Sequence, residues 1–201
     1  MLNSKTKESY TLEIYDYDEN LAKSFMYAGN FTDEQLEEIG EHNLTIYLIG
    51  KSGDLNSITN INNAVCSLLK AGGIAVKVES SGVAHTSERW FELTNSGDLV
   101  DVLNAYVTIL TDGNTCYSCG MHNIGYRDAI ITTDMPLEDA SHLISTFLTY
   151  LLSENPVLKQ GETFSMDSNS PIYLLKQEEC KIYPPNDLFF NPFGYWRLHV
   201  K

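Results

Sequence analysis

The side chains best suited to chemistry lie together in residues 115–128, between two apolar runs that predict strands. Cys116, Cys119 and His122 have the spacing of a redox pair or of half a zinc site, and they are the candidate metal ligands. Two cysteines three positions apart on a straight strand point to opposite faces, however, and no second close pair of ligands exists elsewhere. We therefore expect free, buried cysteines and no metal or other cofactor.

His122 is followed closely by Arg127 and Asp128, which allows two interpretations. A cysteine and His122 could form a nucleophile and base, with Asp128 orienting the imidazole ring. Alternatively, His122 satisfies backbone groups at a strand end while Arg127 and Asp128 form a local ion pair. No oxyanion-hole element and no nucleophile turn is recognisable, so the second interpretation is favoured.

His85 is the second histidine of interest, in a segment (residues 80–90) that follows one expected strand and leads into an expected helix. Such a loop offers helix N-terminal amides that suit an anion. The structural alternative is that Thr86 or Ser87 caps the helix and Trp90 belongs to the core. If the two β-α units pack side by side, His85 could meet His122.

The chain is strongly acidic, with 27 acidic against 13 basic side chains and a formal net charge of −14. This charge repels phosphate backbones and anionic lipids, so we expect neither nucleic acid nor a membrane surface as a partner. The acidic residues are concentrated before residue 43, where Glu34, Glu37, Glu38 and Glu41 follow one another. They form either a solvated surface or a face that attracts a basic protein partner.

Composition and cysteine content indicate the class of protein. With 201 residues and 43% apolar residues, the chain can bury a substantial core. No apolar run approaches the roughly 18 residues that cross a bilayer, and residues 1–8 do not resemble a secretory signal. Four cysteines without such a signal predict a cytoplasmic protein with free thiols.

Hydrophobic periodicity predicts an α+β fold of two β-α-β-like halves, with an antiparallel or mixed sheet and helices packed on one face. We expect a single compact domain (1–201) with an acidic N-terminal extension (1–43) and an aromatic C-terminal tail (181–201) that is buried or forms an interface. Strands are expected at residues 10–15, 44–49, 74–78, 105–110, 115–121, 129–132 and 172–175. Helices are expected at residues 20–28, from 32 with a capping box, from 54 to 71, 98–103 and 136–153.

Four segments resemble an uncharacterised bacterial family, domain of unknown function 4261. They are GGIAV (72–76), SGVAH (81–85), YSCGMH (117–122) and PVLKQGET (156–163). The likeness covers a core of about 44–175. The family pattern does not depend on Cys119 and does not include Cys116, so the resemblance singles out His85 and the turn from Gly120 to His122. It implies a bacterial, cytoplasmic α+β protein and no particular activity.

Two functions remain open at this stage. The favoured one is a non-catalytic binding protein, such as an immunity-type inhibitor of a basic toxin, that uses its acidic surface. The alternative is a small hydrolase-like enzyme that uses His85 and His122, with Arg127 binding an anionic substrate. The oligomeric state is left open.

Overall fold

The structure, a computed structural model, describes residues 9–132 and 134–201. Residues 1–8, where we expect no secretory signal, lie outside the described residues. Within the described part the fold is α+β with antiparallel and mixed sheets, as the sequence predicts. None of the described helices is long and apolar enough to cross a membrane.

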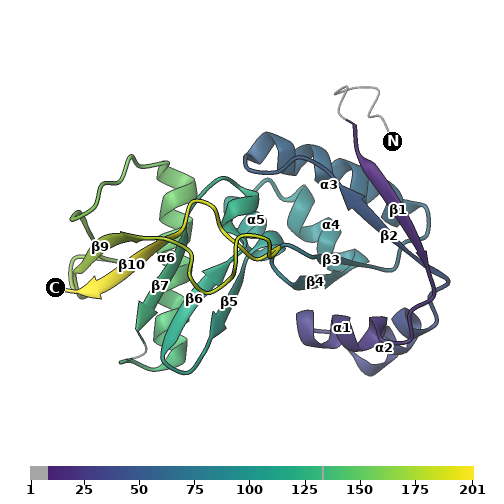
Figure 1. Cartoon of the computed structure of the whole chain (residues 1–201), viewed down its shortest axis with the longest axis horizontal. Helices are drawn as coiled ribbons and strands as arrows, with labels where there is room; N and C mark the ends of the chain where they lie inside the picture. Colours follow the sequence, from purple (N-terminus) through teal and green to yellow (C-terminus); the bar gives the residue numbers. More distant parts are fainter. Residues whose placement is uncertain (1–8, 133) are drawn as a thin grey trace.

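A six-stranded sheet forms the C-terminal half of the molecule (Figure 1). Its strands, in spatial order, are β5 (Thr108–Thr111), β6 (Thr115–Cys119), β7 (Asp128–Thr132), β10 (Tyr195–Val200), β9 (Tyr173–Glu178) and β8 (Thr163–Phe164). All neighbours are antiparallel except β7 and β10, which run parallel. The strand from the aromatic tail therefore lies in the interior of the sheet.

One face of this sheet is covered by helix α6 (Leu137–Glu154), which packs on β6 and β7. The helix buries one apolar stripe, as its period predicts: Ala140, Leu143, Ile144, Phe147, Leu148, Leu151 and Leu152. Pro136 precedes the helix at the N-cap position, one residue earlier than expected, and Asn155 ends it in the left-handed conformation.

The opposite face is covered by the segment that joins β9 to β10. Tyr117, Ile130 and Tyr195 point to this face from neighbouring strands, and Cys180 and Tyr183 of the connecting segment pack on them. Tyr195 and Trp196 are both buried, on opposite faces, because successive side chains alternate along a strand. The first residues of β10 in the aromatic tail are thus part of the protein interior.

The described part of the N-terminal half consists of two separate two-stranded antiparallel sheets and five helices. The first sheet pairs β1 (Thr11–Asp16) with β2 (Leu44–Ile49), and the second pairs β3 (Ala75–Val78) with β4 (Val83–Thr86). The helices are α1 (Leu21–Ala28), α2 (Asp33–Gly40), α3 (Leu55–Lys70), α4 (Ser87–Asn95) and α5 (Leu99–Tyr106). The predicted caps at Thr32, Asp54, Thr86 and Asp98 are confirmed.

Three local predictions are wrong. The strand–helix–strand order of β2, α3 and β3 is present, but β2 and β3 lie in different sheets, so they form no shared β-α-β sheet. The segment before α4 contains the strand β4 instead of an open loop. Ala105 and Tyr106 form the last turn of α5, because a short apolar run fits a buried helix as well as a strand.

One hydrophobic core nevertheless joins the two halves. Ile58 of α3 and Trp90 of α4 belong to the same buried cluster as Phe147 of α6 and Leu198 of β10. All four side chains are 2% exposed or less. A chain that folds as a single compact domain, as the sequence predicts, needs a continuous core of this kind.

Candidate functional site

The two motif turns that the sequence singles out lie against each other. The turn between β3 and β4 meets the turn after β6, which begins at Gly120 and includes a short 3-10 helix (Met121–Asn123). Ser80 Oγ donates a hydrogen bond of 2.7 Å to Asn123 Oδ1. Gly120 has φ +124°, and a Cβ there would overlap the Tyr106 carbonyl and lie 2.9 Å from Ser81 Cβ. Only glycine permits this close approach.

The connecting segment between β9 and β10 closes the same place from a third direction. The Phe189 ring lies against Gly82, and the Phe189 carbonyl lies 3.9 Å from Cys119 Sγ. We call residues 80–82, 120–123 and 188–189 the three-loop junction. It brings together segments that are more than a hundred positions apart in the chain.

Several polar atoms at the junction are buried without a hydrogen-bond partner among the described residues. They are Ser81 Oγ, both ring nitrogens of His122 and Asn123 Nδ2. Burial lowers the pKa of His122, and the Leu188 carbonyl only partly opposes this effect, so the ring is neutral at neutral pH. These atoms are closed off from solvent, although Leu188 at the edge of the junction is 65% exposed.

His85 occupies a different environment from His122. Its Nε2 lies 3.2 Å from the Ala105 carbonyl oxygen, and its ring packs beside Trp90 at 5.9 Å. Burial lowers its pKa as well. No hydrogen bond or ring contact joins His85 to His122 among the described residues, so the structure does not present them as a catalytic pair.

Asp128 makes its hydrogen bonds to neighbouring segments, and none of them goes to His122. Its Oδ1 accepts hydrogen bonds from Ser118 Oγ (2.7 Å) and from the Met121 amide (3.3 Å). Its Oδ2 accepts one of 2.7 Å from Asn191 Nδ2. The expected ion pair with Arg127 is absent from the ion pairs of the described residues. Burial raises the pKa of Asp128 to about 6 despite these donors.

Asn191 is a buried residue that sequence reasoning missed. It is fully buried, and its Nδ2 also donates to the Tyr126 carbonyl (3.0 Å), while its Oδ1 accepts from the Phe193 amide (2.9 Å). It thereby attaches the connecting segment to β7. The Asn191-Pro192 dipeptide, a turn signal in an otherwise aromatic tail, is the feature that could have indicated it.

The two cysteines of the motif point to opposite faces of β6. Cys116 Sγ lies 3.8 Å from Ser141 Oγ of α6, whereas Cys119 faces the connecting segment. Burial raises the pKa of both thiols. In the described part of the chain, no three residues of the metal-binding types gather closely enough to hold a metal ion. Cys116, Cys119 and His122 therefore share no site.

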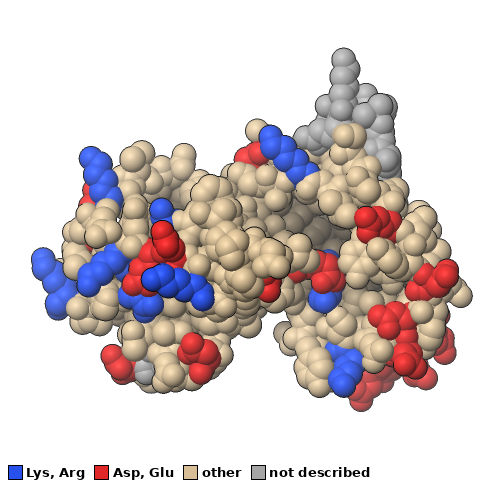
Figure 2. Space-filling model, viewed as in Figure 1, with Lys and Arg blue, Asp and Glu red and all other residues tan. Residues whose placement is uncertain are grey.

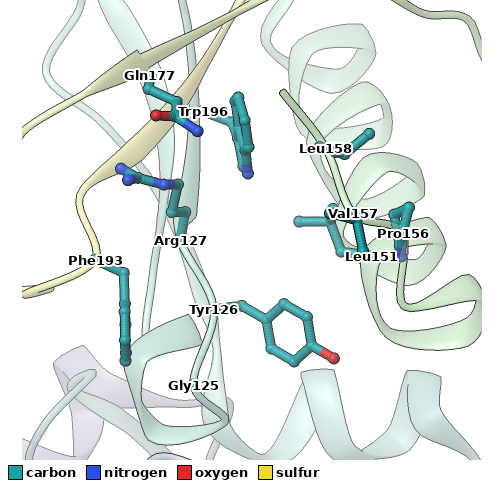
Figure 3. Close-up of a pocket in the computed structure, with 10 residues that line it drawn as sticks. All are labelled: Gly125, Tyr126, Arg127, Leu151, Pro156, Val157, Leu158, Gln177, Phe193 and Trp196. Atoms are coloured by element: carbon teal, nitrogen blue, oxygen red, sulfur yellow. The ribbon is translucent and has the colours of Figure 1, made fainter. Parts of the chain in front are cut away.

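Arg127 points away from the junction and lines a groove of about 310 Å³ (Figure 3). One wall is formed by Leu151, Pro156, Val157 and Leu158, where the chain leaves α6, and the facing wall by Arg127, Gln177, Phe193 and Trp196. The Arg127 guanidinium lies over the Trp196 ring at 5.7 Å. Of the candidate site residues that the sequence singled out, Arg127 is the one that lines this groove.

The predicted acidic residues form a surface on α2. Glu34, Glu37, Glu38 and Glu41 are all exposed, and none takes part in an ion pair among the described residues. Acidic side chains gather over α1 and α2, while many basic ones lie over the far half of the molecule (Figure 2). Glu38 also lines a groove of about 350 Å³ together with Glu88. We call the four glutamates the acidic surface.

The strands β1 and β2, which flank α1 and α2 in the chain, expose many apolar side chains. They pair only with each other among the described strands, so both outer edges of this two-stranded sheet are free. The exposed fractions of its large apolar residues are Ile14 65%, Tyr15 53%, Leu44 48%, Ile46 38%, Tyr47 38% and Ile49 49%. Tyr17 and Tyr27, close by in the chain, are also exposed. By the strand register, Ile14, Leu44 and Ile46 lie on one face of this two-stranded sheet, and Tyr15, Tyr47 and Ile49 lie on the other. We call the exposed apolar residues of β1 and β2, together with Tyr17 and Tyr27, the apolar β1–β2 surface.

The comparisons with known proteins agree with the resemblance over part of the chain. Residues 117–189 match the model of a family described as domain of unknown function (DUF4261). The match includes β6, the turn at His122, α6 and the connecting segment up to Phe189. No curated protein and no solved structure was found to match.

Proposed function

We propose that this protein is a non-catalytic binding protein whose partner is a basic protein. The observation that supports this proposal is that the acidic surface, which makes no ion pair among the described residues, leads along the chain into the exposed apolar β1–β2 surface. Exposed apolar patches rimmed by polar residues mark protein interfaces in soluble proteins. The acidic rim sets the charge of the partner. An immunity-type inhibitor of a basic toxin, in the cytoplasm of a bacterium, fits this combination.

The two parts of the surface have different roles in this proposal. Tyr15, Tyr17 and Tyr47 supply large, amphipathic contact areas of the kind that dominate interface energies. The glutamates of the acidic surface act over a longer range, by increasing the rate at which a positively charged partner arrives. The free outer edges of β1 and β2 additionally offer backbone groups to an extended segment of the partner.

The test combines affinity capture with association kinetics. The tagged wild-type protein is used to capture partners from its native cells at low salt, beside a variant with Glu34, Glu37, Glu38 and Glu41 changed to glutamine. We expect a stoichiometric basic protein on the wild type and a much weaker band on the variant. With the purified partner, the association rate of the variant should be at least about tenfold lower at low salt. The difference should shrink in high salt, where charges are screened.

A matched control removes the same charge from the other half of the molecule. Asp134, Glu138, Glu154 and Glu179 are exposed acidic residues whose side chains make no ion pair among the described residues. Neutralising these four should leave capture and association nearly unchanged. If both variants slow association equally, net charge alone is responsible and the proposed surface is wrong. If neither variant changes it, the electrostatic proposal fails.

The enzyme alternative would assign catalysis to His85 and His122. Both histidines are partly buried, burial lowers the pKa of each, and Asp128 makes its hydrogen bonds to other residues. No observed contact favours that alternative. A His122→Ala variant still tests it, since an enzyme would lose turnover in a substrate screen while the binding protein would keep its partner.

A further inference from the structure

The groove beside Arg127 differs in character from the acidic and apolar surfaces of the other half. Its lining residues are mainly apolar or aromatic, and Arg127 alone among the described lining residues carries a charge. Val157 on one wall is 88% exposed, and Phe193 on the other is 42% exposed. Val157 and Phe193 lie on opposite sides of the groove, and the guanidinium of Arg127 lies on the Phe193 side (Figure 3).

Most N–H groups of the Arg127 guanidinium make no hydrogen bond among the described residues. Its single hydrogen bond among the described residues is a long one, 3.5 Å from Nη1 to the Glu178 carbonyl. The carboxylate of Glu178 is occupied by Arg197, whose Nε lies 2.7 Å from it. Stacking on Trp196 holds the Arg127 group in place without using its N–H groups. A fixed guanidinium with free donors is suited to receive a carboxylate through two parallel hydrogen bonds.

We propose that this groove binds a small amphipathic carboxylate. The carboxylate pairs with the guanidinium of Arg127, and the apolar body of the ligand lies between Trp196, Phe193 and the Val157 wall. Small-molecule sites commonly combine such an apolar lining with a few polar groups that fix the orientation of the ligand. This site is separate from the acidic surface, and its residues include neither His85 nor His122.

The lining also restricts the charge of the ligand. A phosphate monoester would bring a second negative charge into a largely apolar groove that has no second cation among its described lining residues. Desolvation of that charge would be unfavourable. Repulsion from the acidic protein as a whole would add to this cost. A singly charged ligand with an apolar body matches both conditions.

The test measures binding of 1-naphthoate and of its neutral analogue 1-naphthamide by isothermal titration calorimetry. We expect wild-type protein to bind naphthoate at least about tenfold more tightly than naphthamide, because a charge-assisted hydrogen bond distinguishes the two. Arg127→Gln should weaken naphthoate binding by about the same factor and leave naphthamide binding unchanged. Arg89→Gln is the matched control, because Arg89 is an exposed arginine on α4 that pairs with Glu92. It should have no effect.

A second variant keeps the test decisive if Arg127→Gln does not fold. Val157→Asp changes a highly exposed side chain, and its negative charge should weaken naphthoate binding much more than naphthamide binding. Equal binding of the two probes by the wild type would overturn the proposal. So would unchanged naphthoate binding in the folded Arg127→Gln or Val157→Asp variant, or no binding of naphthoate to the wild type at millimolar concentration. Variants of the acidic surface should bind naphthoate normally, so failure here is distinguishable from failure of the proposed function.

Discussion

The buried pair of Asn191 and Asp128 allows a quantitative prediction. Changing Asn191 to alanine removes one hydrogen bond each from Asp128 Oδ2, the Tyr126 carbonyl and the Phe193 amide, all at 2.7–3.0 Å. A buried group left without its partner costs about 1–3 kcal/mol, and more when it is charged. We therefore expect the Asn191→Ala variant to lose about 3–6 kcal/mol of unfolding free energy at pH 8.

The loss should depend on pH, with a sign that follows from the Asp128 carboxyl. Its pKa rises from 3.8 to about 6 on folding, so the folded protein holds the proton more tightly than the unfolded chain. The stability from this group is fully present below about pH 4 and is lost as pH rises through 6, about 3 kcal/mol in all. The Asn191 hydrogen bond opposes the rise in pKa. Its removal should raise the pKa further and make the variant's deficit about 1–2 kcal/mol larger at pH 8 than at pH 5.

The assay is urea unfolding of wild type and variant at pH 5 and pH 8, followed by circular dichroism, with the free energy taken from midpoint and slope. Asn56→Ala is the control, because Asn56 is exposed on α3 and its replacement should change stability by no more than about 0.5 kcal/mol. A deficit below about 1 kcal/mol for Asn191→Ala would contradict the hydrogen-bond assignment. A deficit that is equal at both pH values would refute the coupling to Asp128.

Three further changes test other parts of the structure. Gly120→Ala should destabilise the protein by several kcal/mol more than Gly97→Ala in thermal unfolding. Both glycines have positive φ, but only at Gly120 would the added Cβ overlap a neighbouring carbonyl. Equal losses would contradict the close approach. Phe147→Ala should cost about 3–5 kcal/mol in urea unfolding, since the ring is 0% exposed in the main core, and a loss under 1 kcal/mol would be inconsistent with that position. Iodoacetamide at pH 8 should modify Cys116 and Cys119 far more slowly in the folded protein than in urea, because both thiols are buried and burial raises their pKa. The rates are measured by peptide mass spectrometry, and equal rates would show that the sheet opens.

The features that the sequence predicted well are local ones. The capping box at Thr32 and the cap at Asp54 depend on residues within three positions, and both are found as expected. The stripe of α6 follows from the helical period alone. The opposite orientations of Cys116 and Cys119 follow from the alternation of side chains along a strand.

The features that could not be predicted from the sequence depend on pairing between distant segments. Strand β10 has an unremarkable, aromatic-rich sequence, and its position between β7 and β9 comes from backbone hydrogen bonds to both. The groove at Arg127 exists because β10 places Trp196 beside a residue from 69 positions earlier. The sequence suggested an ion pair or a catalytic role for Asp128 because it is a carboxylate. Its hydrogen-bond partner Asn191 is brought to it by the same long-range pairing.

From sequence alone, the α+β class, several helix caps, the negative charge and the family resemblance of the segment around His122 could be stated, because each depends on composition or on neighbours along the chain. The tertiary structure decided that His85 and His122 stand in separate environments, that Asp128 is structural and that Arg127 faces a groove. It also showed that the four glutamates and many apolar residues of β1 and β2 are exposed. The physical reason is that side-chain environment and solvent exposure are set by which segments pack together, and packing is a property of the whole chain.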